Sequence, residues 1–141
     1  MSSTLRELSA LVPGSRVHGD AEVRVSGVTS DSRSVEPGDL FAAISGGTHD
    51  AAAFAPSAIA RGARAVMASR PLAIDAPTLV VDDVRAALGP VSQRAFGEPT
   101  RAMRTVGITG TNGKTTVSYL LESVLAHAGL APALLGTVAL R

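Results

Sequence analysis

The residues best suited to chemistry form one uninterrupted loop in the last third of the chain. Read in order, they are Gly110, Thr111, Asn112, Gly113, Lys114, Thr115 and Thr116. Glycines let the backbone turn sharply, so that several N–H groups point at one anion, and a helix that starts at the turn adds the positive end of its dipole. Lys114 supplies a mobile charge for terminal phosphates, and Thr115 supplies a hydroxyl ligand for Mg²⁺. The loop is therefore predicted to cradle phosphates.

Regular structure is predicted on both sides of this loop. Thr105–Ile108 is interpreted as a short buried strand before it. After it, apolar residues recur at the spacing of one helix face, at Val117, Leu120, Leu121, Val124, Leu125 and Ala128. The loop departs from the general phosphate-loop pattern, because Ile108 stands where that pattern has its first glycine. The alternative interpretation is a Gly-Asn turn that caps an ordinary helix.

A second polar loop lies near the N-terminus, between two predicted strands. It carries Ser30, Asp31, Ser32 and Arg33, and a Pro37-Gly38 turn follows. These side chains offer a polar ligand two hydroxyl groups and the N–H donors of the Arg33 guanidinium. Asp31 and Arg33 could equally brace the turn, and residue types alone favour bracing.

Both loops resemble sequences of one family, the Mur ligases. TGTNGKTT (109–116) is similar to their ATP loop, which folylpolyglutamate and cyanophycin synthetases share. TSDSRSVEPGDLFAA (29–43) is similar to the DSR…PGDLF signature of the N-terminal domain of MurE and MurF ligases, where this loop contacts the uridine of a UDP-sugar. The resemblance covers residues 27–141 and is closest to the MurE branch. It implies that Ser30 and Ser32 contact the UDP-sugar, while Asp31 and Arg33 hold the loop.

A third loop belongs to the same resemblance. Gly47, Thr48 and His49 correspond to a loop of pattern GxxxDGxxF that lines the uracil pocket of the family. Asp50 matches that pattern, whereas Ala51 replaces its glycine. His49 is either a ligand contact or an ordinary surface residue. The three histidines of the chain are scattered and predict no metal site.

The resemblance implies an ATP-dependent, amide-forming ligase. ATP would phosphorylate the D-glutamyl carboxylate of UDP-MurNAc-L-Ala-D-Glu, and the amine of a diamino acid (meso-diaminopimelate or L-lysine) would attack the acyl phosphate. The implied ligands are that UDP-MurNAc-dipeptide, ATP with Mg²⁺ and the diamino acid, with no obligate protein partner. Lys114 would be the catalytic residue, stabilising the transferring phosphoryl group. The alternatives are a MurF-type ligase and a non-catalytic, truncated module that binds UDP-sugar or nucleotide.

Composition excludes several other classes of function. The chain has 141 residues, no cysteine and a formal net charge of +1, with charges of both signs interspersed. This balance gives no electrostatic case for binding nucleic acid or an anionic membrane. No stretch approaches the length of a transmembrane helix. We therefore expect a soluble cytoplasmic chain without disulfides.

The chain is predicted to be α/β, with its domain boundary near residue 100. Residues 1–100 would form the N-terminal UDP-MurNAc-binding domain, and Gly97–Thr100 would be a linker. Residues 101–141 would form the first βαβ unit of a truncated ATP-binding domain, with a second strand at Ala133–Val138. A unit of that size cannot bury a core alone. The 141-residue chain is therefore expected to be inactive as a ligase.

Overall fold

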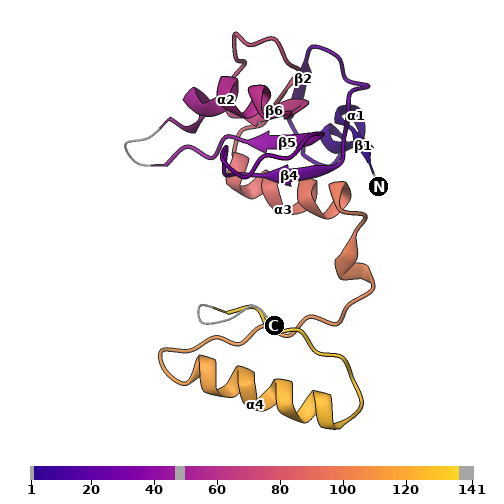
Figure 1. Cartoon of the computed structure of the whole chain (residues 1–141), viewed down its shortest axis with the longest axis vertical. Coiled ribbons are helices and arrows are strands. Elements are labelled where there is room, and N and C mark those ends of the chain that lie inside the picture. Colours follow the sequence, from indigo (N-terminus) through magenta and orange to yellow (C-terminus); the bar gives the residue numbers. More distant parts are fainter. Residues whose placement is uncertain (1, 47–49, 137–141) are drawn as a thin grey trace. The chain divides into compact units, whose positions relative to one another are not determined.

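The computed structural model describes residues 2–46 and 50–136. It divides into two compact units, Met1–Met103 and Arg104–Arg141 (Figure 1). The division falls close to the predicted boundary at residue 100. None of the helices in the described ranges is both long and apolar enough to cross a membrane.

A five-stranded, mostly parallel sheet forms the centre of the first unit. Its strands in spatial order are β2 (Arg16–His18), β7 (Thr78–Val80), β6 (Ala65–Ala68), β5 (Asp39–Ala42) and β4 (Gly27–Thr29). The strands β4 to β7 are parallel, and only β2 runs antiparallel to its neighbour β7. The carboxyl ends of four strands therefore meet at one edge of the sheet. This arrangement confirms the predicted α/β class.

Helices cover both faces of this sheet. The helices α1 (Leu5–Ser9) and α3 (Val84–Ala95) lie on one face, and the 3₁₀ helix η1 (Ala51–Phe54) with α2 (Ala55–Ala60) lies on the other (Figure 1). Side chains of β5 alternate between the two cores, so Leu40 packs with α1 and α3 while Phe41 packs with α2. Both side chains are buried because strands between two helical layers have no solvent face.

Short elements complete this unit. The strands β1 (Ser3–Thr4) and β3 (Arg24–Val25) pair as a separate two-stranded sheet. The 3₁₀ helix η2 (Pro99–Arg101) follows α3 in the predicted linker, after Glu98, a non-glycine residue with a φ of +58°. Glu98 forms ion pairs with Arg94 (3.4 Å) and Arg101 (2.6 Å), so this part of the linker has a defined conformation.

Local signals explain where the helices begin. Thr4 and Glu7 form the reciprocal hydrogen bonds of a capping box at the start of α1. Asp83 caps α3, which continues as one helix through Pro90. Gly62 closes α2 with a φ of +113°, and a Cβ there would lie 2.9 Å from the Cα of Pro37. Only glycine fits this turn between α2 and β6.

The second unit contains the predicted helix, α4 (Lys114–His127), and Gly129 follows it with a φ of +79°. The prediction of a strand at Thr105–Ile108 was wrong, since no strand is assigned between residues 104 and 136. A strand requires a hydrogen-bonded neighbour, and the described residues of this unit provide none. The second expected strand, Ala133–Val138, lies partly outside the described residues.

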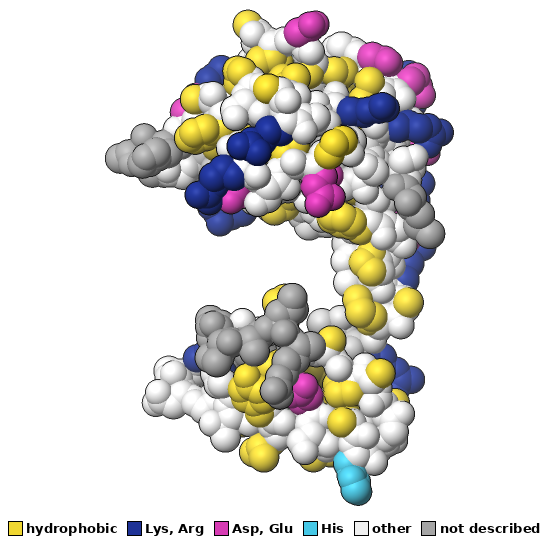
Figure 2. All heavy atoms as spheres, in the orientation of Figure 1, with side chains coloured by type: hydrophobic (Ala, Val, Ile, Leu, Met, Phe, Trp, Pro, Cys, Tyr) yellow, Lys and Arg dark blue, Asp and Glu magenta, His cyan; other side chains and the backbone are white. Residues whose placement is uncertain are grey.

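The apolar face of α4 is only partly covered, since Leu121 and Leu125 are half-buried. None of its residues is buried, and Val117, Leu120 and Val124 are 50%, 62% and 64% exposed. Figure 2 shows hydrophobic side chains at the surface of this unit. The periodicity of the sequence correctly predicted a helix with one apolar face. The second unit alone does not bury that face.

Candidate functional site

The loop before α4 leaves the N-terminus of the helix open. Gly113 is the N-cap residue with a φ of +77°, and no side chain caps the helix. The first backbone hydrogen bond of α4 runs from the Val117 N–H to the Gly113 carbonyl (2.9 Å). The N–H groups of the first turn therefore have no helical acceptor, and the helix dipole favours an anion at this point. This is the geometry that a phosphate requires.

The side chain of Lys114 contacts the loop that precedes α4. The Lys114 ammonium donates a hydrogen bond to the Gly110 carbonyl, which holds the charge over the loop. Gly110 has a φ of +152°, and a Cβ there would lie 3.6 Å from the Asn112 carbonyl oxygen. Thr111, Asn112, Thr115 and Thr116 are all exposed. All seven residues predicted for phosphates therefore lie at one exposed helix terminus.

The structure places Thr115, the residue predicted to bind Mg²⁺, in the first turn of α4, where it is exposed. Among the described residues its hydroxyl makes no hydrogen bond, and its carbonyl oxygen accepts one from the Ser118 hydroxyl (2.8 Å). Residues 2–46 and 50–136 contain no group of three or more His, Cys, Asp or Glu side chains able to hold a metal. Because Mg²⁺ is commonly bound through few protein ligands with phosphates and waters, a single hydroxyl fits an ion that arrives with a nucleotide.

The loop after β4 is braced from within. The Asp31 carboxylate accepts hydrogen bonds from the Arg33 backbone N–H (2.9 Å) and from its guanidinium Nε (3.0 Å) and Nη2 (2.8 Å). These side-chain bonds to Arg33, followed by its backbone N–H, lower the pKa of Asp31 to about 2. The carboxylate is charged at neutral pH. Asp31 and Arg33 therefore hold the loop, as the family resemblance implies.

The two serines of this loop are arranged differently. Ser30 is exposed and Ser32 is half-buried. In the part of the chain that the structure describes, neither hydroxyl makes a hydrogen bond. Both remain available to a ligand at the carboxyl end of β4. The other three predicted contacts, Gly47, Thr48 and His49, lie outside the described residues.

Asp50 forms a second braced point, at the end of the segment that follows β5. Its carboxylate accepts hydrogen bonds from Arg70 Nη2 (2.7 Å), the Ala52 N–H (3.0 Å) and the Ser45 hydroxyl (3.2 Å). The hydrogen bond from Arg70, followed by that from Ala52, lowers the pKa of Asp50. The sequence analysis assigned no role to Arg70. No local signal links residues 20 positions apart.

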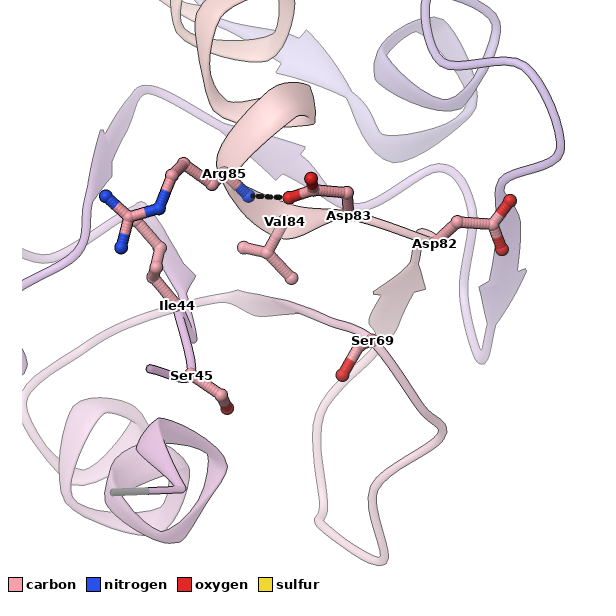
Figure 3. Close-up of a pocket in the computed structure, with 7 residues that line it drawn as sticks. All are labelled: Ile44, Ser45, Ser69, Asp82, Asp83, Val84 and Arg85. Carbon is pink, nitrogen blue, oxygen red and sulfur yellow. Dashed lines mark hydrogen bonds between the residues drawn. The ribbon is translucent and has the colours of Figure 1, made fainter. Parts of the chain in front are cut away.

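A cavity of about 370 Å³ opens at the same edge of the sheet (Figure 3). It is lined by residues that follow β5 (Ile44 and Ser45), β6 (Ser69) and β7 (Asp82, Asp83, Val84 and Arg85). Asp83 also caps α3 by accepting hydrogen bonds from the Arg85 N–H (2.8 Å) and the Ala86 N–H (3.1 Å). Ligands of open α/β sheets bind at the carboxyl ends of the strands. The sequence analysis assigned no ligand-binding role to Asp82 or Asp83.

Comparison with known proteins identifies this architecture. The family model described as "Mur ligase family, catalytic domain" matches residues 24–97. The chain belongs to the Mur ligase family. The match includes the parallel strands of the sheet, the braced loop after β4 and the cavity, and it ends before the phosphate loop.

Individual Mur ligases match nearly the whole chain. The UDP-N-acetylmuramoyl-L-alanyl-D-glutamate–2,6-diaminopimelate ligase of Geobacillus thermodenitrificans (strain NG80-2) is 40% identical over 134 residues, which are 95% of this chain and 27% of that protein. A crystal structure of MurF from Acinetobacter baumannii superposes with a TM-score of 0.79 and 30% identity, covering 97% of this chain and 30% of that one.

A third similar structure contains a bound nucleotide. MurF ligase from Thermotoga maritima in complex with ADP superposes with a TM-score of 0.59 and 26% identity, covering 73% of this chain and 24% of that one. The chain spans less than a third of the length of each of these three proteins.

Proposed function

We propose that this chain is the N-terminal portion of an ATP-dependent Mur ligase that adds 2,6-diaminopimelate to UDP-MurNAc-L-Ala-D-Glu. One observation carries the proposal: 40% identity over 95% of the chain to a ligase of that name. The two motifs that would bind substrate and nucleotide both fall within this similarity. The proposed reaction belongs to peptidoglycan synthesis, and we expect it to occur in the cytoplasm.

The first unit would bind the UDP part of the substrate. Ser30 and Ser32 are proposed as its contacts, together with Gly47, Thr48 and His49. The support for the serines is their position, on a loop that Asp31 and Arg33 hold in shape, with hydroxyls that make no hydrogen bond among the described residues. Binding costs less free energy when the loop already has a fixed conformation than when the ligand must order the loop.

The second unit would bind ATP through residues Gly110–Thr116. Bound ATP would supply the phosphoryl group that activates the substrate carboxylate. The open first turn of α4 would bind phosphate oxygens, and Thr115 would hold Mg²⁺ on them. Lys114 would leave the Gly110 carbonyl and place its ammonium on the transferring group, where charge stabilisation is the main task of the protein.

A MurF-type ligase is the second candidate, favoured by the superposition on MurF from Acinetobacter baumannii. Such a ligase joins D-alanyl-D-alanine, as the full name of a related Acinetobacter protein states. The sequence relatives that share 37–44% identity with the chain are diaminopimelate ligases by name, which argues against it. A non-catalytic module that binds a UDP-sugar is the third candidate, because the chain spans only part of its relatives.

The deciding experiment measures ligation by the full-length ligase that contains this chain. With UDP-MurNAc-L-Ala-D-Glu and ATP, we expect amide formation with 2,6-diaminopimelate and release of ADP and phosphate. Use of D-alanyl-D-alanine with a UDP-MurNAc-tripeptide would replace the proposal by the MurF alternative. Calorimetry on the 141-residue chain completes the test: we expect it to bind UDP-MurNAc-dipeptide, and no binding would contradict the role given to the first unit.

A further inference from the structure

The Asp50 carboxylate joins three segments at the carboxyl edge of the sheet. Its Oδ2 accepts a hydrogen bond from Arg70 Nη2 (2.7 Å), in the segment after β6. Its Oδ1 accepts from the Ser45 hydroxyl (3.2 Å), after β5, and from the Ala52 N–H (3.0 Å), in the first turn of η1. One side chain therefore links the ends of two neighbouring strands to the start of the helical layer.

This junction and the proposed UDP contact Ser30 lie at the same edge of the sheet, where the parallel strands end. The strand β5 pairs with β4 on one side and β6 on the other, with Thr29 opposite Phe41 and Phe41 opposite Val66. The ends of β4 and β5 are therefore neighbours; Ser30 directly follows β4, and Ser45 follows the last residue of β5 by three positions. Ser45 lines the cavity, and so does Ser69, the residue before Arg70 (Figure 3).

The ion pair between Arg70 and Asp50 contributes little to the stability of the fold. Their side chains remain 59% and 54% exposed, and exposed pairs contribute little to the free energy of folding. The pair does fix geometry, because Arg70 orients one carboxylate oxygen and leaves the other for Ser45 and Ala52. A contact that orients a hydroxyl at a cavity wall can affect binding there even where it adds little stability.

We infer that Arg70 is a positioning residue of the nucleotide-sugar site. It holds Asp50, and through Asp50 it holds Ser45 at the end of β5, in the orientation that receives the uridine diphosphate part of the substrate. The inference rests on the proposed function and names a residue whose effect is indirect. Arg70 itself does not contact the ligand.

A double-mutant cycle on the 141-residue chain tests this, with UDP as the probe and calorimetry as the measurement. Asp50→Asn removes the charge but keeps an oxygen that can cap η1 and accept from Ser45. Arg70→Gln removes the other charge. We expect each single variant to bind UDP about two- to fivefold more weakly, the range expected for an exposed pair. The double variant should bind no more weakly than the weaker single variant, because both changes break the same contact.

Two controls separate positioning from general destabilisation. Arg6→Gln breaks the Arg6–Glu22 pair, which is 71% and 62% exposed and links α1 to the turn before β3, and it should leave UDP affinity unchanged. Arg70→Lys keeps a cation that can pair with Asp50 and should recover part of the lost affinity. The thermal midpoints of all variants should agree with that of the unmodified chain.

The outcomes are distinguishable. If the losses from Asp50→Asn and Arg70→Gln multiply in the double variant, or if only Arg70→Gln weakens binding, Arg70 contacts the ligand directly and the inference is wrong. If the unmodified chain does not bind UDP, the proposed function fails and the inference fails with it.

Discussion

The same truncation should affect the two units of this chain very differently. Leu79 lies in β7 and is 0% exposed, whereas Leu120 lies in α4 and is 62% exposed. Leu79→Ala would leave a cavity between β7 and the layer of α1 and α3, and such changes cost about 2–5 kcal/mol of unfolding free energy. Leu120→Ala removes a side chain that is mostly in water already. We expect it to change stability by less than about 0.5 kcal/mol, because alanine also has the higher helix propensity.

Urea unfolding followed by circular dichroism would measure both variants. A loss of about 2–5 kcal/mol is a large fraction of the stability of a domain of this size. Leu79→Ala should therefore shift the main transition strongly or prevent folding. Hydrogen exchange gives the same comparison without a substitution. Amides of Val117 to Leu125 should exchange much faster than those of β5 and β6, because an isolated helix of this length is marginal in water.

One result would refute this reasoning. If Leu120→Ala lowered the unfolding free energy by more than about 1 kcal/mol, the face of α4 would be covered in solution. The same conclusion would follow if α4 amides of the monomeric chain were protected as well as those of β5 and β6. Protection that depends on protein concentration would instead indicate self-association through this face.

Further predictions concern the sites and one helix cap. In the full-length ligase, Lys114→Ala should lower the ligation rate at least about 10²-fold and leave the affinity for UDP-MurNAc-dipeptide nearly intact; turnover near the unmodified rate would exclude the phosphate role. The double change Ser30→Ala and Ser32→Ala should weaken binding of that substrate by about 0.5–1.5 kcal/mol per lost hydrogen bond, and unchanged affinity in calorimetry would make both serines ordinary turn residues. Asp83→Ala should lower the thermal midpoint of the chain, because caps contribute about 0.5–2 kcal/mol, whereas Asp83→Asn should stay near the original value.

Sequence alone determined the features that depend on neighbouring residues. The capping box of Thr4 and Glu7, the Asp83 cap and the helix after Gly113 were all predictable, because the interacting groups are at most four residues apart. The buried strands were predictable from apolar runs bounded by turn residues. The two loops proposed to bind ligands stand out in the sequence because their residue types and order resemble one family.

Contacts between segments that are far apart in the sequence were decided only by the tertiary structure. The contact between Arg70 and Asp50, and the cavity formed where β5, β6 and β7 end, depend on which strands are neighbours, and local patterns do not contain that information. The same reason explains the wrong prediction at Thr105–Ile108. Its apolar pattern is that of a strand, but a strand forms only where another segment offers hydrogen bonds, and the described residues of its unit offer none.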